Sequence, residues 1–119
     1  MSITILSQSA TVGGLEDWGT PARSLSEVPC KLSGIEVDLA GAGENRTGIW
    51  ECQPGSFERQ LANAELMHIL TGECTFTPQG GEALSIKAGD TLFFPANTFG
   101  QWNVIQTIRK VYVVMASPH

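Results

Sequence analysis

The chain has 119 residues, a length that suits one domain with its own hydrophobic core. Seven basic and twelve acidic residues give a net charge of −5, and the basic residues are scattered along the chain. Because nucleic acids and acidic lipid surfaces bind clustered cations, we expect no nucleic acid and no membrane as partners.

The three cysteines and the N-terminus point to a reducing compartment. Cys30, Cys52 and Cys74 are an odd number at wide spacing, which fits neither a disulfide framework nor a zinc ribbon. The N-terminus lacks the basic and long apolar regions of a signal peptide, and no apolar run approaches the ~20 residues of a membrane span. We therefore predict a cytoplasmic protein with three buried thiols.

Residues 1–31 are polar and rich in small side chains, and we interpret them as an N-terminal arm. Trp18 is the candidate anchor that would pack the arm on the rest of the chain or on a partner subunit. A mostly mobile terminus is the alternative. Residues 32–117 form the predicted domain.

From residue 32 onward, short apolar segments alternate with turn signals. Segment 35–39 alternates apolar and polar residues, which is the period of a half-buried strand. Pro54-Gly55 and Gly72-Glu73 are read as turns. The predicted strands are 35–39, 47–52, 57–61, 66–70, 74–77, 83–87, 91–94, 101–105 and 110–115. Eight or nine strands and no convincing helix predict an all-β sandwich or jelly-roll barrel.

An ordered series of motifs across about residues 33–115 resembles the cupins. The series comprises Gly48-Ile-Trp50-Glu51-Cys52, Glu65-Leu-x-His68-Ile-Leu-x-Gly72, Gly89-Asp90 with Pro95, Gly100-x-Trp102-x-Val104 and Arg109-Lys110-x-Tyr112. It is most similar to the subfamily named for the cupin domain of (S)-ureidoglycine aminohydrolase, much of which has no known function. The resemblance implies a single-domain, RmlC-like jelly-roll, antiparallel β-barrel with one site inside it.

The resemblance also implies where a cupin would hold a metal ion. Metal-binding cupins typically supply two His and one Glu from the first motif and one His from the second. With Glu65 as that glutamate, the histidine positions hold Glu58 or Arg59, Gln60 or Leu61, and Gly100. Ureidoglycine aminohydrolases use Glu, His, His and Gln, and the positions similar to these hold Arg59, Leu61, Glu65 and Gly100.

Imidazole is the neutral nitrogen ligand that binds transition metals at neutral pH, and it is missing at every one of these positions. We therefore predict no metal site, no cofactor and no ureidoglycine aminohydrolase activity. A weakly held divalent ion is the alternative.

Glu65 is the central candidate for chemistry inside the barrel. Burial without a charge partner raises the pKa of a carboxyl group, which suits general acid–base catalysis. Arg59 could instead neutralise Glu65 and fix its geometry, and a purely structural pair is the alternative to any ligand role. Strand alternation places Met67 on the face of Glu65 and His68 on the opposite face, unless a bulge intervenes.

The resemblance also implies that strands with aromatic side chains lie near the site, and these side chains are candidates for the cavity wall. Indole and phenol groups combine an apolar surface with a polar handle, which suits small polar ligands. The same rings could simply fill a small barrel. The predicted ligand-binding residues are Trp50, Phe57, Arg59, Gln60, Glu65, Met67, Trp102 and Tyr112.

These residues support two functional hypotheses and a structural one. The first is a metal-free protein that binds a small molecule inside the barrel. The second is an enzyme (an isomerase, lyase or hydrolase on a small polar metabolite) that uses Glu65 as acid/base or a weakly held divalent metal. The third is a structural homodimer with the barrel packed shut. Whether the chain is an enzyme stays open, and we expect a homodimer because the family commonly pairs and only 16% of residues are charged.

Overall fold

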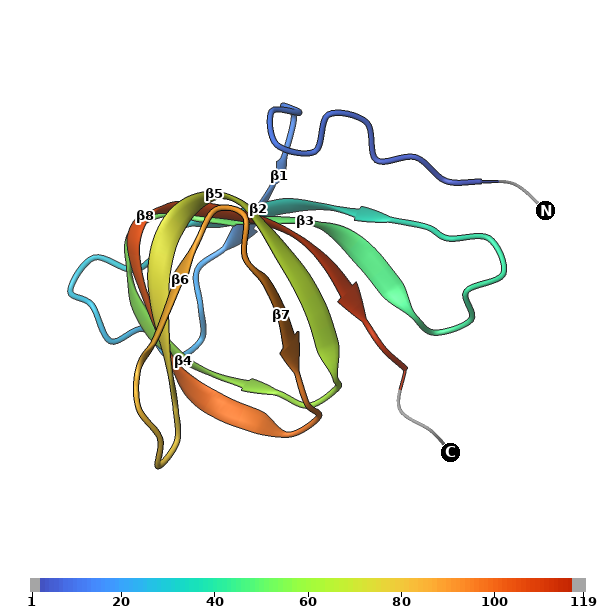
Figure 1. Ribbon diagram of the computed structural model, residues 1–119. Coiled ribbons are helices and arrows are strands. Elements are labelled where there is room, and N and C mark those ends of the chain that lie inside the picture. The colour runs from blue at the N-terminus through green and yellow to red at the C-terminus, as the bar shows by residue number, and fades with distance from the viewer. Residues whose placement is uncertain (1–2, 117–119) are drawn as a thin grey trace.

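The computed structural model describes residues 3–116 and shows one curled sheet of eight antiparallel strands (Figure 1). The strands are β1 (Glu16–Gly19), β2 (Leu32–Val37), β3 (Arg46–Cys52), β4 (Gly55–Leu61), β5 (Glu65–Pro78), β6 (Leu84–Lys87), β7 (Thr91–Phe94) and β8 (Thr98–Val114). The prediction of an all-β fold is confirmed. No helix in the described residues is long and apolar enough to cross a membrane. The outer ends of the predicted arm and domain, residues 1–2 and 117, lie outside the described part.

β8 is the strand around which the sheet is organised. β3 and β4 pair with successive halves of β8 on one side, and β5 pairs along its length on the other. The strand order is β1-β2-β3-β8-β5-β6, and β7 pairs with β5. Between residues 3 and 116 no strand pairing joins β1 to β6. The sheet therefore curls in the manner of a jelly roll without closing into a hydrogen-bonded ring.

Two strands are longer than the sequence predicted. Segments 66–70 and 74–77 belong to the 14-residue β5, and segments 101–105 and 110–115 lie within the 17-residue β8, apart from Met115. The predicted turn at Gly72-Glu73 is wrong, because the pairing with β8 continues through it with shifts of register. Gly72 has a φ of 94°, and a side chain here would collide with the backbone of Thr107. The glycine therefore marks a bulge, which bends a strand without ending it.

The predicted arm takes part in the sheet. Its residues 16–19 form β1, which pairs with β2 at the sheet edge. The indole of Trp18 packs against the core and occupies the space where a side chain on Gly34 would stand. Because Gly34 has no side chain, the indole of Trp18 can pack directly on β2 and hold the arm there.

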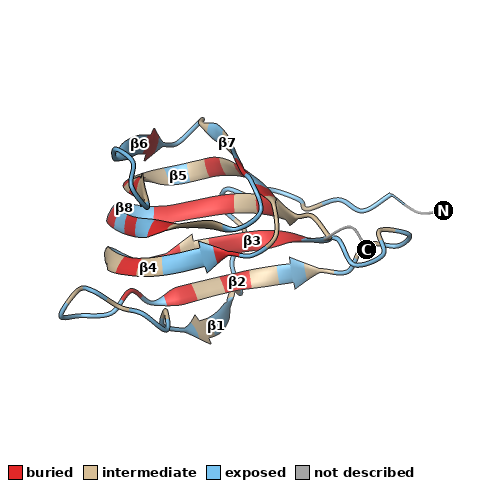
Figure 2. Cartoon of the chain, turned by 90° about the horizontal axis from the view of Figure 1, so that it is seen from below, coloured by how far each residue is buried: buried red, intermediate tan, exposed pale blue. Residues whose placement is uncertain are grey.

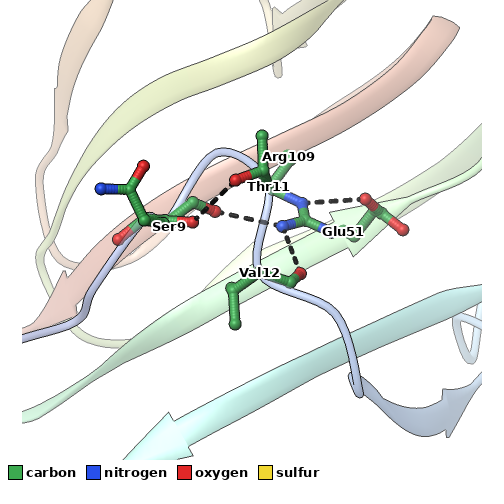
Figure 3. A network of polar contacts seen from close by, with 6 residues as sticks. Ser9, Thr11, Val12, Glu51 and Arg109 are labelled. Atoms are coloured by element: carbon green, nitrogen blue, oxygen red, sulfur yellow. Dashed lines mark hydrogen bonds and ion pairs between the residues drawn. The ribbon is translucent and has the colours of Figure 1, made fainter.

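Arg109 of β8 holds an earlier part of the arm from the outer face of the sheet (Figure 3). Its Nη1 donates to the carbonyl oxygens of Ser9 at 3.1 Å and Val12 at 2.8 Å. Its Nε donates to Oε1 of Glu51 at 3.0 Å. A planar guanidinium presents several donors in fixed directions, so one side chain can tie the arm to β3 and β8 at once.

The hydrophobic core lies on the concave side of the sheet. Figure 2 shows buried residues concentrated along β3 and β8. Phe76, Phe94 and Trp102 form an aromatic cluster between β5, β7 and β8, with ring centroids 4.7 to 5.6 Å apart. This cluster fills the part of the interior next to Gly100, where the ring of Phe76 takes the space that a side chain would need.

Candidate functional site

Strand register brings the candidate site residues to the concave face. Trp50 of β3 lies opposite Lys110 of β8, and Tyr112 lies opposite Met67 of β5. Side chains two residues apart on a strand share a face, so Lys110 and Tyr112 point inward together with Glu65 and Met67. The neighbouring Arg109 points outward, where it forms the contacts with the arm.

Lys110 and Glu65 form a buried ion pair at the centre of this face. Nζ of Lys110 lies 3.0 Å from Oε2 of Glu65, and the two side chains are only 8% and 6% exposed. The ammonium group also lies 3.7 Å from Sδ of Met67, and 4.5 Å and 5.5 Å from the ring centroids of Trp50 and Trp102. The two rings supply cation–π contacts to the ammonium.

Burial lowers the pKa of Lys110, because the charged ammonium loses its hydration. The carboxylate of Glu65 acts in the opposite direction, and Arg59 adds to the lowering. The net direction is downward. Lys110 therefore gives up its proton more readily than an exposed lysine does, and it does so beside a carboxylate that can accept that proton.

The charge partner of Glu65 differs from the one expected from the sequence. The expectation was Arg59 or no charge partner, and both alternatives are wrong, because Glu65 pairs with Lys110. Arg59 is exposed on β4, opposite Gly100, and takes part in none of the ion pairs of residues 3–116. The signal for Lys110 was its position two residues before Tyr112, which already stood among the cavity candidates.

A cavity of about 530 Å³ lies over the ion pair. Its lining comes from six strands and reaches from the buried pair to exposed side chains, so it opens to solvent. The lining residues are Glu16, Trp18, Leu32, Glu36, Arg46, Trp50, Arg59, Glu65, Lys110, Tyr112 and Val114.

Three acidic and three basic side chains line this cavity, and most of them are paired. Glu36 and Arg46 approach to 3.9 Å near the surface, while Glu65 and Lys110 pair at its floor. Arg59 remains as a cation that faces the cavity without a carboxylate partner within the described residues. Burial raises the pKa of Tyr112, so its phenol keeps its proton and can donate a hydrogen bond.

The predicted ligand-binding residues fall into three groups. Trp50, Arg59, Glu65 and Tyr112 line the cavity. Met67 and Trp102 are buried beside the ammonium of Lys110 and shape its surroundings. Phe57 is a core residue and Gln60 is exposed, and both line a separate hollow of about 360 Å³ on β4. Lys110, Arg46 and the cavity residues of β1 and β2 were not among the ligand-binding residues predicted from the sequence.

The residues at the cupin metal positions do not fit a transition-metal ion. Arg59 is a cation, Leu61 is buried and apolar, and Gly100 has no side chain and is covered by Phe76. Oε2 of Glu65 is already bound to the ammonium of Lys110. Across residues 3–116, no three His, Cys, Asp or Glu side chains are grouped to hold a metal.

His68 and the cysteines lie outside this chemistry. His68 is on the face opposite Glu65, as strand alternation predicts, and its Nδ1 lies 2.7 Å from Oγ1 of Thr91. The three cysteines are buried and free of disulfides. Burial raises the pKa of Cys74 to about 11, so it stays a thiol at neutral pH rather than the nucleophilic thiolate.

Comparisons with known proteins give one family match and several related folds. The family described as EutQ-like cupin domain matches residues 39–112. The putative ethanolamine utilization protein Q of Salmonella typhimurium LT2 is 22% identical with a TM-score of 0.63, over 76% of this chain and 72% of that one. A Pseudomonas syringae protein of unknown function from the DUF861 family is 22% identical with a TM-score of 0.77, over 87% of this chain and 45% of that one.

A cupin superfamily protein from Desulfitobacterium hafniense is 16% identical with a TM-score of 0.58, over 71% of this chain and 78% of that one. At these identities the likenesses show the fold alone. No curated protein matches the chain.

Proposed function

Because the chain belongs to the family of EutQ-like cupin domains, whose fold supplies a concave interior without fixing an activity, we propose that it binds a small carboxylate-bearing molecule there. The observation that carries the proposal is the buried Lys110–Glu65 pair, 3.0 Å apart, at the floor of a cavity of about 530 Å³.

The size and walls of the cavity support a small ligand. Its volume falls within the ~300–1,000 Å³ that small-molecule pockets span. Trp18, Trp50 and Val114 supply apolar wall beside the six charged side chains of the lining. A barrel packed shut, the third hypothesis from the sequence, would leave no such space.

Arg59 supports the choice of an anionic ligand. A guanidinium binds a carboxylate through two parallel hydrogen bonds, and this one is exposed and without a carboxylate partner in the described chain. Arg59 lines the same cavity as Lys110 and Glu65, and its positive charge contributes to the lowered pKa of Lys110. A ligand carboxylate bound to Arg59 would therefore lie near the Lys110–Glu65 pair.

The enzyme hypothesis stays as the second candidate, since Lys110 and Glu65 together form a proton donor and acceptor facing the cavity.

The narrower resemblance to the ureidoglycine aminohydrolase cupin domain remains a prediction without an activity attached. A cytoplasmic location also remains a prediction, and the three free, buried thiols are in keeping with a reducing compartment.

Binding is tested by isothermal titration calorimetry with acetate, pyruvate and glyoxylate as probes. We expect saturable binding of at least one probe, and Arg59→Gln should weaken it about 10- to 100-fold through loss of charge-assisted hydrogen bonds. Arg23→Gln is the matched control, because Arg23 is an exposed arginine outside this cavity. Absence of binding to all three probes, or equal affinities for wild type and Arg59→Gln, would contradict the proposal.

We also propose that two copies of the chain pair through the outer face of β5 and β7. Leu66 and Phe93 are register partners on this face and are 40% and 56% exposed. Contiguous exposed apolar side chains are a feature of many protein–protein contact surfaces. Light scattering should give twice the chain mass of 12.8 kDa, and Leu66→Glu with Phe93→Glu should halve it. A wild-type monomer at working concentration would refute this pairing.

A further inference from the structure

We propose that Lys110 acts as an amine nucleophile that forms an imine with the carbonyl group of a 2-oxo acid, while Glu65 carries the proton. The inference rests on the proposed function, because it assigns a substrate class to the same cavity, and it adds a reversible covalent step that ligand binding alone does not require.

Lys110 differs from the other lysines of the chain in its surroundings. The sequence has three lysines, and Lys31 and Lys87 are exposed. Lys110 is buried at the cavity floor, with its ammonium between Glu65 and the ring of Trp50. An amine attacks a carbonyl only in its neutral form, and lysines that act this way are desolvated or lie beside another cation. Lys110 meets the first condition, since its side chain is 8% exposed, and Arg59 lines the same cavity.

The charged and titratable groups that act on Lys110 lie on two strands, β5 and β4. Glu65 of β5 favours the ammonium form, whereas burial and Arg59 of β4 favour the neutral amine. Cys74 of β5 is a thiol at neutral pH and brings no charge. A bound carboxylate neutralises the positive charge of Arg59, which otherwise favours the neutral amine. The reaction therefore depends on Glu65 as the acceptor of the Lys110 proton.

Glu65 completes the proton balance of the step. Its carboxylate takes one proton from the Lys110 ammonium across the 3.0 Å hydrogen bond, which leaves a neutral amine and a carboxylic acid. The nitrogen lone pair forms a C–N bond to the carbonyl carbon, and the amine proton moves to the oxygen to give a carbinolamine. Glu65 returns its proton to the hydroxyl group, the C–O bond breaks, and water leaves. The products are a protonated imine, water and the Glu65 carboxylate, with no oxidant or reductant consumed.

A 2-oxo acid is the class that fits the positions of these groups. It carries a carboxylate and a carbonyl on adjacent carbons, so a carboxylate bound at Arg59 presents the carbonyl toward Lys110. The substituent on the far side of the carbonyl would lie against the apolar wall that Trp18 and Trp50 supply. An aldehyde without a carboxylate has no group for Arg59 and should react less.

The inference is tested by reductive trapping with the full chain, using glyoxylate and pyruvate as probes and sodium cyanoborohydride as reductant. Peptide mapping should place the reduced adduct on Lys110, at least tenfold above Lys31, Lys87 and the N-terminal amine. Labelling should become faster as the pH rises, because the fraction of neutral amine increases toward and above the pKa of Lys110. Acetaldehyde, which lacks the carboxylate, should label Lys110 no better than the exposed lysines.

Variants separate the roles of the groups. Lys110→Arg should abolish the adduct and Lys87→Arg, the matched control, should leave it unchanged. Glu65→Gln should slow labelling by roughly 100-fold, the lower end of what general acid–base catalysis supplies, while Lys110 stays the modified residue. Labelling that is spread evenly over the three lysines, or no labelling at any pH, would overturn the imine.

Failure of this inference is distinguishable from failure of the proposed function. Probes that bind in the calorimeter but leave no adduct refute the imine and keep the binding site. Probes that neither bind nor label refute both. If Lys110→Arg does not fold, the wild-type peptide map and the comparison of pyruvate with acetaldehyde still decide the question.

Discussion

Replacement of Lys110 by methionine should lower the free energy of unfolding by about 3–5 kcal/mol, the cost typical of removing one partner of a buried ion pair. Methionine approximates the length of the lysine stem, so the loss arises mainly from Glu65, which would keep its burial without its ammonium partner. Urea denaturation followed by tryptophan fluorescence measures the change, because Trp50 and Trp102 both lie near Lys110.

Two further variants identify the cause of that loss. Lys110→Met combined with Glu65→Gln removes both charges, and most of the stability should return, since buried pairs are often replaceable by neutral residues. Arg46→Met is the matched control, because it breaks the ion pair with Glu36 whose side chains are 58% and 51% exposed, and it should cost no more than about 1 kcal/mol. If the double variant is as unstable as Lys110→Met, the loss does not come from the unpaired carboxylate of Glu65.

Phe76→Ala should lower the free energy of unfolding by about 3–5 kcal/mol, the range for deletion of a large aromatic side chain from a core. Phe76 is 1% exposed and packs against Phe94 and Trp102, with centroids 5.1 Å and 4.7 Å away. Its removal leaves a void beside Gly100 that the rigid neighbouring strands can close only in part. Thermal and urea unfolding give the change.

The control for Phe76→Ala is Ile105→Ala on β8. Ile105 is 51% exposed, so its truncation should change the stability by no more than about 0.5 kcal/mol. Equal losses of unfolding free energy for the two substitutions would mean that Phe76 is not tightly packed in the core. A much larger loss for Phe76→Ala would support a filled interior around Phe76, with the open cavity at Lys110.

The strands were predictable from the sequence where the signal is local. The alternation at 35–39 and the turn dipeptide Pro54-Gly55 correspond to β2, and to the passage from β3 to β4, within a few residues. The error at Gly72-Glu73 has a physical cause. A tight turn and a bulge both need a glycine with positive φ, and only the pairing of β5 with β8 tells them apart.

The candidate site was predictable only in part, for the same reason. Glu65 is marked by its own motif, and Trp50 and Tyr112 by the cupin resemblance, which places their strands near the site. Lys110 is 45 residues beyond Glu65, and their meeting depends on the register of β5 against β8. No single turn joins β5 to β8, so turn chemistry in the sequence does not fix their register. The cavity walls from β1 were missed because the arm gave no sign of a strand.

Arg109 and Lys110 are neighbours in the chain, but their side chains lie on opposite faces of the sheet and have different roles. The outward Arg109 ties the arm to the sheet through Ser9 and Val12 (Figure 3). The inward Lys110 forms the floor of the cavity with Glu65. The sequence shows only a dibasic pair, and the strand places the two charges in different environments.

The most direct test of the central claim is NMR of the protein labelled with ¹³C at the Cε of lysine, titrated with pyruvate without reductant. Three lysines give three signals that Lys31→Arg and Lys87→Arg assign. The account predicts a saturable shift of the Lys110 signal alone, which Arg59→Gln weakens. A Lys110 signal that stays unmoved while pyruvate binds, or equal shifts of all three lysines, would show that the ligand does not occupy this cavity.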